Sequence, residues 1–137
     1  MTTATSKSSR ALNIALWTAQ VILAGMFVMA GITKTTKPID ELATMLPWVN
    51  DMPAELVRFI GVSEFLGALG LVLPSLLRIK PGLTPLAAFG LLLIMVFAAI
   101  YHLTKGEFSA ILINSVIGLI AFFVAWGSYR LALLNPR

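Results

Sequence analysis

The sequence contains no cysteine and a single histidine, His102. Without cysteine there are no disulfides, thiolate metal sites, iron–sulfur clusters or covalently attached haem groups. One histidine per chain also excludes a haem held by two imidazoles of the same chain. We therefore predict no metal site, and any redox role needs a cofactor that is held without those ligands.

Charged residues are scarce as well. They make up 12% of the 137 residues, against 58% hydrophobic residues, and the mean hydropathy is +0.92. A soluble domain of this size cannot bury so much apolar surface. Lipid must therefore surround most of the chain, so we predict a polytopic membrane protein whose main partner is the bilayer.

Four apolar runs lie between the charged residues, each about 20 residues long, which matches a ~30 Å hydrocarbon core. They cover residues 11–32, 57–77, 83–104 and 108–129. The connection at residues 105–107 is so short that the last two runs must form an antiparallel hairpin. We predict an all-α fold, an up-down-up-down bundle of four transmembrane helices. The bundle forms one domain over residues 11–131, between a disordered cytoplasmic tail at residues 1–10 and a C-terminal tail at residues 132–137.

The loop at residues 33–56 has a pattern of its own. Pro38 opens a segment that has carboxylates in its first turn and apolar residues at helical spacing. This pattern predicts a short amphipathic helix that lies at the outer interface, with Trp48 at the level of the head groups. Asp51 and Pro53 then form an N-cap and first-turn proline pair, which predicts the start of the second span.

Membrane topology explains the net charge of +4 better than a nucleic-acid-binding surface does. The ten Lys and Arg residues are scattered at span ends and form no basic stripe, so nucleic acid is not an expected partner. With the N-terminus in the cytoplasm, six of the ten basic residues lie on the cytoplasmic side and all six carboxylates lie outside. The positive-inside rule therefore predicts that both termini are cytoplasmic.

Polar residues inside the spans fall in one half of the predicted membrane. At 1.5 Å per residue, Glu64 lies roughly 5 Å, Asn114 roughly 7 Å and His102 roughly 13 Å outward of the midplane. Lys34 lies near the outer boundary, and Gln20 lies close to the midplane. Four helices thus bring a cation, a carboxylate, an imidazole and an amide to the same outer half.

Small residues surround Glu64 on its helix. Gly61, Gly67 and Ala68 occupy neighbouring helical positions. Such residues mark surfaces where membrane helices pack closely, so we expect Glu64 to point into the bundle.

A carboxylate in hydrocarbon needs either a proton or a partner, and Lys34 and His102 are the candidates. We predict a polar cluster of Lys34, Glu64, His102, Asn114 and Gln20. Two interpretations of this cluster remain open: a ligand-binding pocket, or structural contacts that fix how the helices pack.

Several segments of the chain resemble one known family. The most specific is residues 60–71 (IGVSEFLGALGL), and the others are residues 16–20, 30–34, 99–102 and 113–114. Together they resemble the DoxX-like family of small bacterial membrane proteins. The resemblance implies a four-helix bundle in the bacterial inner (plasma) membrane, with Lys34, Glu64, His102 and Asn114 as a shared polar cluster.

The resemblance leaves more than one function open. Some relatives are subunits of a thiosulfate:quinone oxidoreductase, and distant animal relatives assist the assembly of other membrane proteins. The first hypothesis is accordingly a redox accessory subunit that binds a quinone, or another small amphipathic ligand, beside Glu64 and His102. The second is a non-catalytic binding or assembly protein, with other membrane subunits or a second copy as partner. A proton-coupled transporter is a third and weaker interpretation, because no charged residue lies in the cytoplasmic half of any span.

Overall fold

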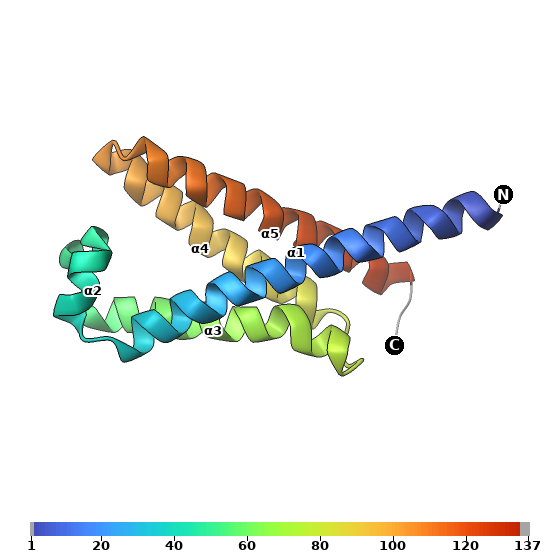
Figure 1. Ribbon diagram of the computed structural model, residues 1–137, viewed down its shortest axis with the longest axis horizontal. Coiled ribbons are helices and arrows are strands. Elements are labelled where there is room, and N and C mark those ends of the chain that lie inside the picture. Colours follow the sequence, from blue (N-terminus) through green and yellow to red (C-terminus); the bar gives the residue numbers. More distant parts are fainter. Residues whose placement is uncertain (1, 135–137) are drawn as a thin grey trace.

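The computed structural model describes the backbone of residues 2–134 and the side chains of residues 10–131. All regular structure in this part of the chain is helical. The elements are α1 (Thr2–Thr36), α2 (Ile39–Met45), the 3-10 helix η1 (Pro47–Asp51), α3 (Ala54–Leu76), α4 (Leu83–Lys105) and α5 (Phe108–Leu134). The four long helices run side by side along the long axis of the molecule (Figure 1), which confirms the predicted bundle.

The four long helices are long and apolar enough to cross a membrane. The spans are Arg10–Thr36, Ala54–Leu76, Leu83–Lys105 and Phe108–Leu131. At most 28% of the residues in each apolar window are buried inside the protein, so most of their side chains face the surroundings. Such an apolar surface is stable against lipid hydrocarbon, and an α-helix there hydrogen-bonds its own backbone N–H and C=O groups. The chain is an integral membrane protein.

The first helix starts earlier than the sequence predicted. We expected a disordered tail over residues 1–10, whereas α1 begins at Thr2. No proline occurs before Pro38 and no glycine before Gly25, so nothing in the N-terminal segment interrupts a helix that grows back from the first span. At the other end, α5 continues to Leu134, and the remainder of the predicted C-terminal tail lies outside the described residues.

Proline and glycine set the ends of several elements. Pro38 precedes α2, and Gly106 ends α4 in the left-handed conformation with φ 70°, which glycine adopts without strain. The second span begins just after Pro53, as predicted, but the capping roles differ: Asp51 ends η1, and Pro53 itself is the N-cap of α3. The amphipathic helix predicted in the loop corresponds to α2.

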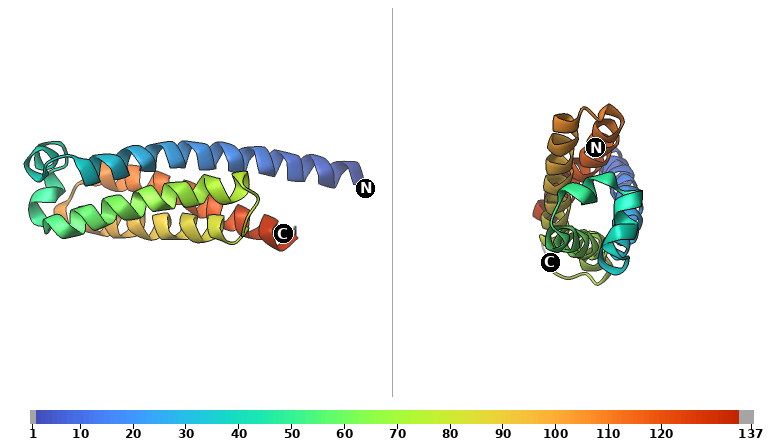
Figure 2. Two further views of the ribbon diagram at one scale, coloured as in Figure 1. Left: turned by 90° about the horizontal axis from the view of Figure 1, so that it is seen from below. Right: turned by 90° about the vertical axis from the view of Figure 1, so that its left-hand side faces the viewer.

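The helices form two close pairs. α1 packs along α3, and α4 packs along α5, while the contacts of α3 with α4 and of α1 with α5 are fewer. Figure 1 shows the two pairs diverging toward the end that carries α2 and η1. We call this the α2 end, and the end where α3 passes into α4 the closed end. Figure 2 shows α2 and η1 lying across the α2 end.

Apolar packing joins the two pairs in the rest of the bundle. The core cluster consists of Leu23, Phe27, Ala68, Leu71, Ala88, Leu91, Met95, Ala121 and Val124. Gly67 lets the Leu91 side chain press against α3, because a Cβ there would lie 2.8 Å from the Leu91 side chain. Beyond this contact, toward the α2 end, the two pairs separate.

Candidate functional site

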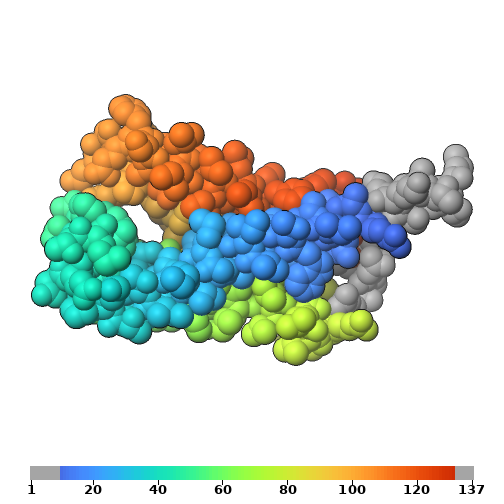
Figure 3. All heavy atoms as spheres, viewed as in Figure 1, coloured from blue at the N-terminus to red at the C-terminus, as the bar shows by residue number. Residues whose placement is uncertain are grey.

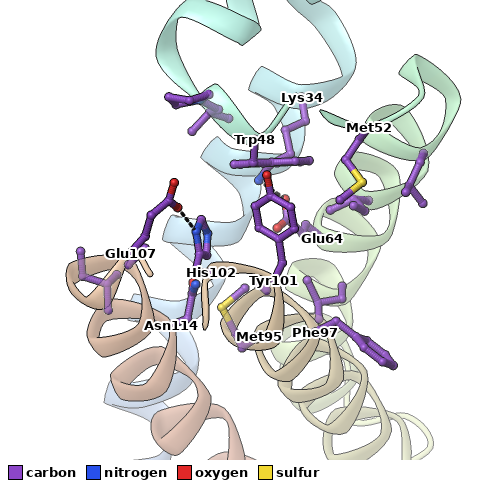
Figure 4. Close-up of a pocket in the computed structure, with 18 of the residues that line it drawn as sticks. Lys34, Trp48, Met52, Glu64, Met95, Phe97, Tyr101, His102, Glu107 and Asn114 are labelled. Atoms are coloured by element: carbon purple, nitrogen blue, oxygen red, sulfur yellow. Dashed lines mark hydrogen bonds and ion pairs between the residues drawn. The ribbon is translucent and has the colours of Figure 1, made fainter. Parts of the chain in front are cut away.

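A cleft of about 1220 Å³ lies between the two helix pairs at the α2 end. In the space-filling view a hollow separates the α2 region from the α4–α5 hairpin (Figure 3). Residues of all four long helices and of η1 line the cleft, and most of them are apolar. The lining side chains that carry a polar group are Lys34, Trp48, Glu64, Tyr101, His102, Glu107, Ser109 and Asn114. Figure 4 shows several of these side chains around the cleft.

A buried ion pair lies on the α1–α3 side of the cleft. Lys34 Nζ donates a hydrogen bond to Glu64 Oε2 at 2.7 Å, and the two side chains are only 11% and 4% exposed. A charge pair this deep in the protein costs desolvation energy that good geometry must offset. Within the described residues every buried side-chain nitrogen and oxygen has a hydrogen-bond partner. The structure thus selects Lys34, one of the two predicted candidates, as the partner of Glu64.

Two glycines bring α1 and α3 close enough for this pair to form. A Cβ at Gly31 would lie 2.7 Å from the Gly61 carbonyl oxygen, and a Cβ at Gly61 would lie 2.7 Å from the Lys34 Cβ. Arg58 adds a second link, because its Nη1 donates a hydrogen bond to the Lys34 carbonyl oxygen at 2.7 Å. This bond satisfies one of the free carbonyls at the end of α1.

His102 does not reach Glu64. Its Nδ1 lies 2.5 Å from Glu107 Oε2, across the turn between α4 and α5. Gly106 reverses the chain, and the Glu107 amide then bonds the His102 carbonyl at 3.0 Å, which places the two side chains together. The expectation that His102 is a candidate partner for Glu64 is therefore wrong, because a nearer carboxylate takes its Nδ1.

One contact ties the α4–α5 hairpin to η1. The Tyr101 hydroxyl donates a hydrogen bond to Asp51, and Lys105 Nζ lies 3.4 Å from the same carboxylate oxygen. The hydrogen bond from Tyr101, followed by the interaction with Lys105, lowers the pKa of Asp51 below its ordinary value of 3.8. These contacts hold η1 against the end of α4.

Comparison with known proteins identifies the family. A family model described as the DoxX-like family matches residues 18–124, which include the cleft residues from α1 to α5. The chain belongs to the DoxX-like family. Comparisons with curated proteins and with solved structures gave no match.

The cleft of this DoxX-like protein contains four of the five predicted site residues. Lys34, Glu64, His102 and Asn114 all line it. Gln20 does not line the cleft; it lies eleven residues before Gly31 on α1, roughly 16 Å toward the closed end, and is only 4% exposed. Gln20 therefore belongs to the packed part of the bundle.

Sequence reasoning missed several residues of the site. Trp48 and Tyr101 fit an interfacial aromatic belt, yet both line the cleft, and Tyr101 also binds Asp51. The sequence placed Glu107 in a tight turn. The only signal for its role in the site was its position directly after Gly106, the left-handed glycine that ends α4. Arg58 has no sequence signal that points to the end of another helix.

The described part of this DoxX-like chain holds no group of three or more His, Cys, Asp or Glu side chains arranged to hold a metal ion. The polar groups of the cleft instead suit hydrogen bonding to an organic ligand. Lys34 carries three N–H donors, of which Glu64 takes one, and His102 has a second ring nitrogen besides the one that faces Glu107.

Proposed function

We propose that this DoxX-like protein binds a quinone in the cleft and serves as an accessory subunit of a quinone-linked oxidoreductase. The observation that carries the proposal is the position of the Lys34–Glu64 pair and His102 on opposite walls of one apolar cleft. A ligand site of this kind combines a mostly apolar wall with a few polar groups that orient the ligand. The protein supplies binding and electrostatics, and the quinone supplies the redox chemistry.

A quinone ring suits these groups because its two carbonyl oxygens accept hydrogen bonds at opposite edges. The Lys34 ammonium can donate to one carbonyl from the α1–α3 wall. When both ring nitrogens of His102 carry a proton, Nδ1 donates to Glu107 and the second nitrogen can donate to the other carbonyl from the α4–α5 wall. The flat ring then lies against the apolar residues between the two walls.

The proposed location of the site follows from membrane topology. We propose that the protein lies in the bacterial inner membrane with both termini in the cytoplasm, which puts the α2 end on the outer side. Six of the ten basic residues then lie on the cytoplasmic side, as the positive-inside rule requires. A second protein that exchanges electrons with the quinone completes the proposed complex.

Trp48 provides a direct binding assay, because it lines the cleft while Trp17 and Trp126 do not. In a Trp17→Phe, Trp126→Phe variant purified in mild detergent, Trp48 is the only tryptophan. We expect a ubiquinone head group to quench its fluorescence in a saturable way. We also expect bound quinone in a lipid extract of the purified protein. Absence of both signals would reject quinone binding and favour the assembly hypothesis.

A substitution at His102 tests the mode of binding. His102→Phe keeps a flat ring and removes both nitrogens, so it should weaken quinone binding about tenfold, the scale of one lost hydrogen bond. Tyr129→Phe is the matched control, because it also removes one polar group but lies outside the cleft. Equal affinities of the two variants would contradict the proposed contact.

A further inference from the structure

The edge of the cleft between α3 and α4 is lined by exposed aromatic residues. Two large aromatic side chains line the cleft there, Phe59 on α3 and Phe97 on α4, and each is 67% exposed. A side chain that lines a cleft and is also largely exposed forms its rim. Figure 4 shows the Phe97 ring on the side of the cleft nearest α3, away from His102 and Glu107. We call this edge, between Phe59 and Phe97, the α3–α4 window.

The packing of α3 against α4 puts these two rings at the same level. Toward the closed end, Gly67 contacts Leu91 and Gly70 contacts Ala87. Extending this antiparallel register toward the α2 end brings Phe59 and Phe97 level to within about one helical turn. The seam is therefore closed at Gly67 and open beside the two rings.

The window lies within the hydrocarbon layer. Phe97 is eight residues from the end of α4 at Lys105, or roughly 12 Å into the span. The α5 side of the cleft is different: Phe108 and Ile113 also line the cleft and are exposed, but the polar residues Ser109 and Asn114 line it beside them. An apolar chain that leaves the cleft through the α3–α4 window therefore passes exposed lining residues that are all apolar.

The cleft is also larger than a quinone ring alone would fill. At about 1220 Å³ it exceeds the roughly 300–1,000 Å³ of ordinary ligand pockets. A quinone head group alone leaves much of this volume unfilled. An attached hydrocarbon tail fills the apolar part and continues into the membrane.

We infer that the ligand is a quinone with an isoprenoid tail, and that the tail leaves the cleft through the α3–α4 window between Phe59 and Phe97. This inference rests on the proposed function and adds to it the class of ligand and the path of its tail. The polar ring lies between Lys34 and His102, and the tail lies against the two phenylalanine rings.

A comparison of ligands with and without a tail tests the inference. The probes are the ubiquinone head group and its decyl-tailed analogue, titrated against the variant with Trp48 as its only tryptophan. Phe97→Ala should weaken binding of the decyl analogue about fivefold more than it weakens binding of the bare head group, the scale of roughly ten lost dispersion contacts with the tail. Phe122→Ala is the matched control, since Phe122 is exposed on α5 and does not line the cleft.

A second measurement does not depend on a substitution. A quinone whose tail carries a photoreactive diazirine should label residues 56–60 and 93–97, as mapped by mass spectrometry. Labelling at residues 108–113 instead would overturn the inference, and so would an equal effect of Phe97→Ala on both probes. In either case saturable quenching by the head group would leave the proposed function standing. If neither probe quenches Trp48 and the lipid extract holds no quinone, both the inference and the proposed function are rejected.

Discussion

The closed end and the α2 end of this bundle use different interactions. Toward the closed end, small residues and leucines interlock, as where Gly127 receives the Leu16 side chain and Gly67 receives Leu91. At the α2 end, charged side chains form most of the specific contacts. In a membrane, close backbone approach is what holds helices together, so the small residues decide where the pairs meet.

The polar contacts at the α2 end lie mainly within each helix pair. Lys34 and Glu64 join α1 to α3, while His102 and Glu107 join the two sides of the α4–α5 turn. Among the described residues of the α2 end, only the contacts of Asp51 reach from one pair's side to the other. Because these two ion pairs each form within one helix pair, they do not draw the two pairs together across the cleft. Polar pairing at the α2 end thus preserves the cleft, whereas apolar packing toward the closed end joins the two helix pairs.

The largest expected effect comes from breaking the buried pair. Glu64→Gln leaves the Lys34 ammonium buried without a counter-charge, which should lower the free energy of unfolding by about 3 kcal/mol. Lys34→Met in the same chain should recover part of this loss, because no unpaired charge remains. Thermal melts in detergent followed by circular dichroism measure both. Additive losses in the double variant would show that the two side chains are not coupled.

The next largest effect concerns the approach of α1 to α3. Gly31→Ala places a methyl group against the Gly61 carbonyl and the Phe65 backbone nitrogen, so the helices must move apart. We expect a loss of about 2 kcal/mol in the same melts. Gly25→Ala is the matched control, since nothing lies within 4 Å of a Cβ there, and it should not destabilise the protein. Similar melting curves for the two variants would contradict the proposed close contact.

The second ion pair should contribute much less than the first. Glu107 is 50% exposed, so Glu107→Gln should change the free energy of unfolding by less than about 1 kcal/mol. This is the same substitution as Glu64→Gln, made in a pair whose carboxylate is half exposed. A loss as large as that of Glu64→Gln would remove the distinction between a buried and an exposed pair.

The smallest effect is local and depends on pH. Since the folded-state pKa of Asp51 is lowered, its contacts stabilise η1 above pH 3.8 and are lost as the pH falls through that lowered pKa. With Trp48 as the only tryptophan, its emission should shift to longer wavelength over this acid range. Asp51→Asn should show the shifted emission already at neutral pH. Identical acid transitions with and without Asp51 would assign the change to another group.

The fold was largely predictable because it depends on long, uniform signals. Four runs of membrane-spanning length and a tight turn at Gly106 determine the number and direction of the helices. The convergence of Lys34, Glu64, His102 and Asn114 was also predictable, because helical depth and the small residues beside Glu64 indicate one end and the interior.

The partners within the site were not predictable in the same way. Depth along a helix does not reveal that α1 and α3 meet at Gly31 and Gly61 while α4 and α5 diverge from them. His102 bonds Glu107 because of one left-handed residue in a turn, which is a local geometric effect. The start of α1 at Thr2 was also not predicted, because a polar composition alone does not stop a helix that has already formed.

The divergence of the two helix pairs also shapes how the protein sits among lipids. A bundle that is broader at one end displaces more lipid from one leaflet than from the other, so it acts as a wedge. Bending the bilayer so that the leaflet around the α2 end expands would relieve this mismatch. The same geometry that leaves room for a ligand therefore couples the protein to membrane curvature.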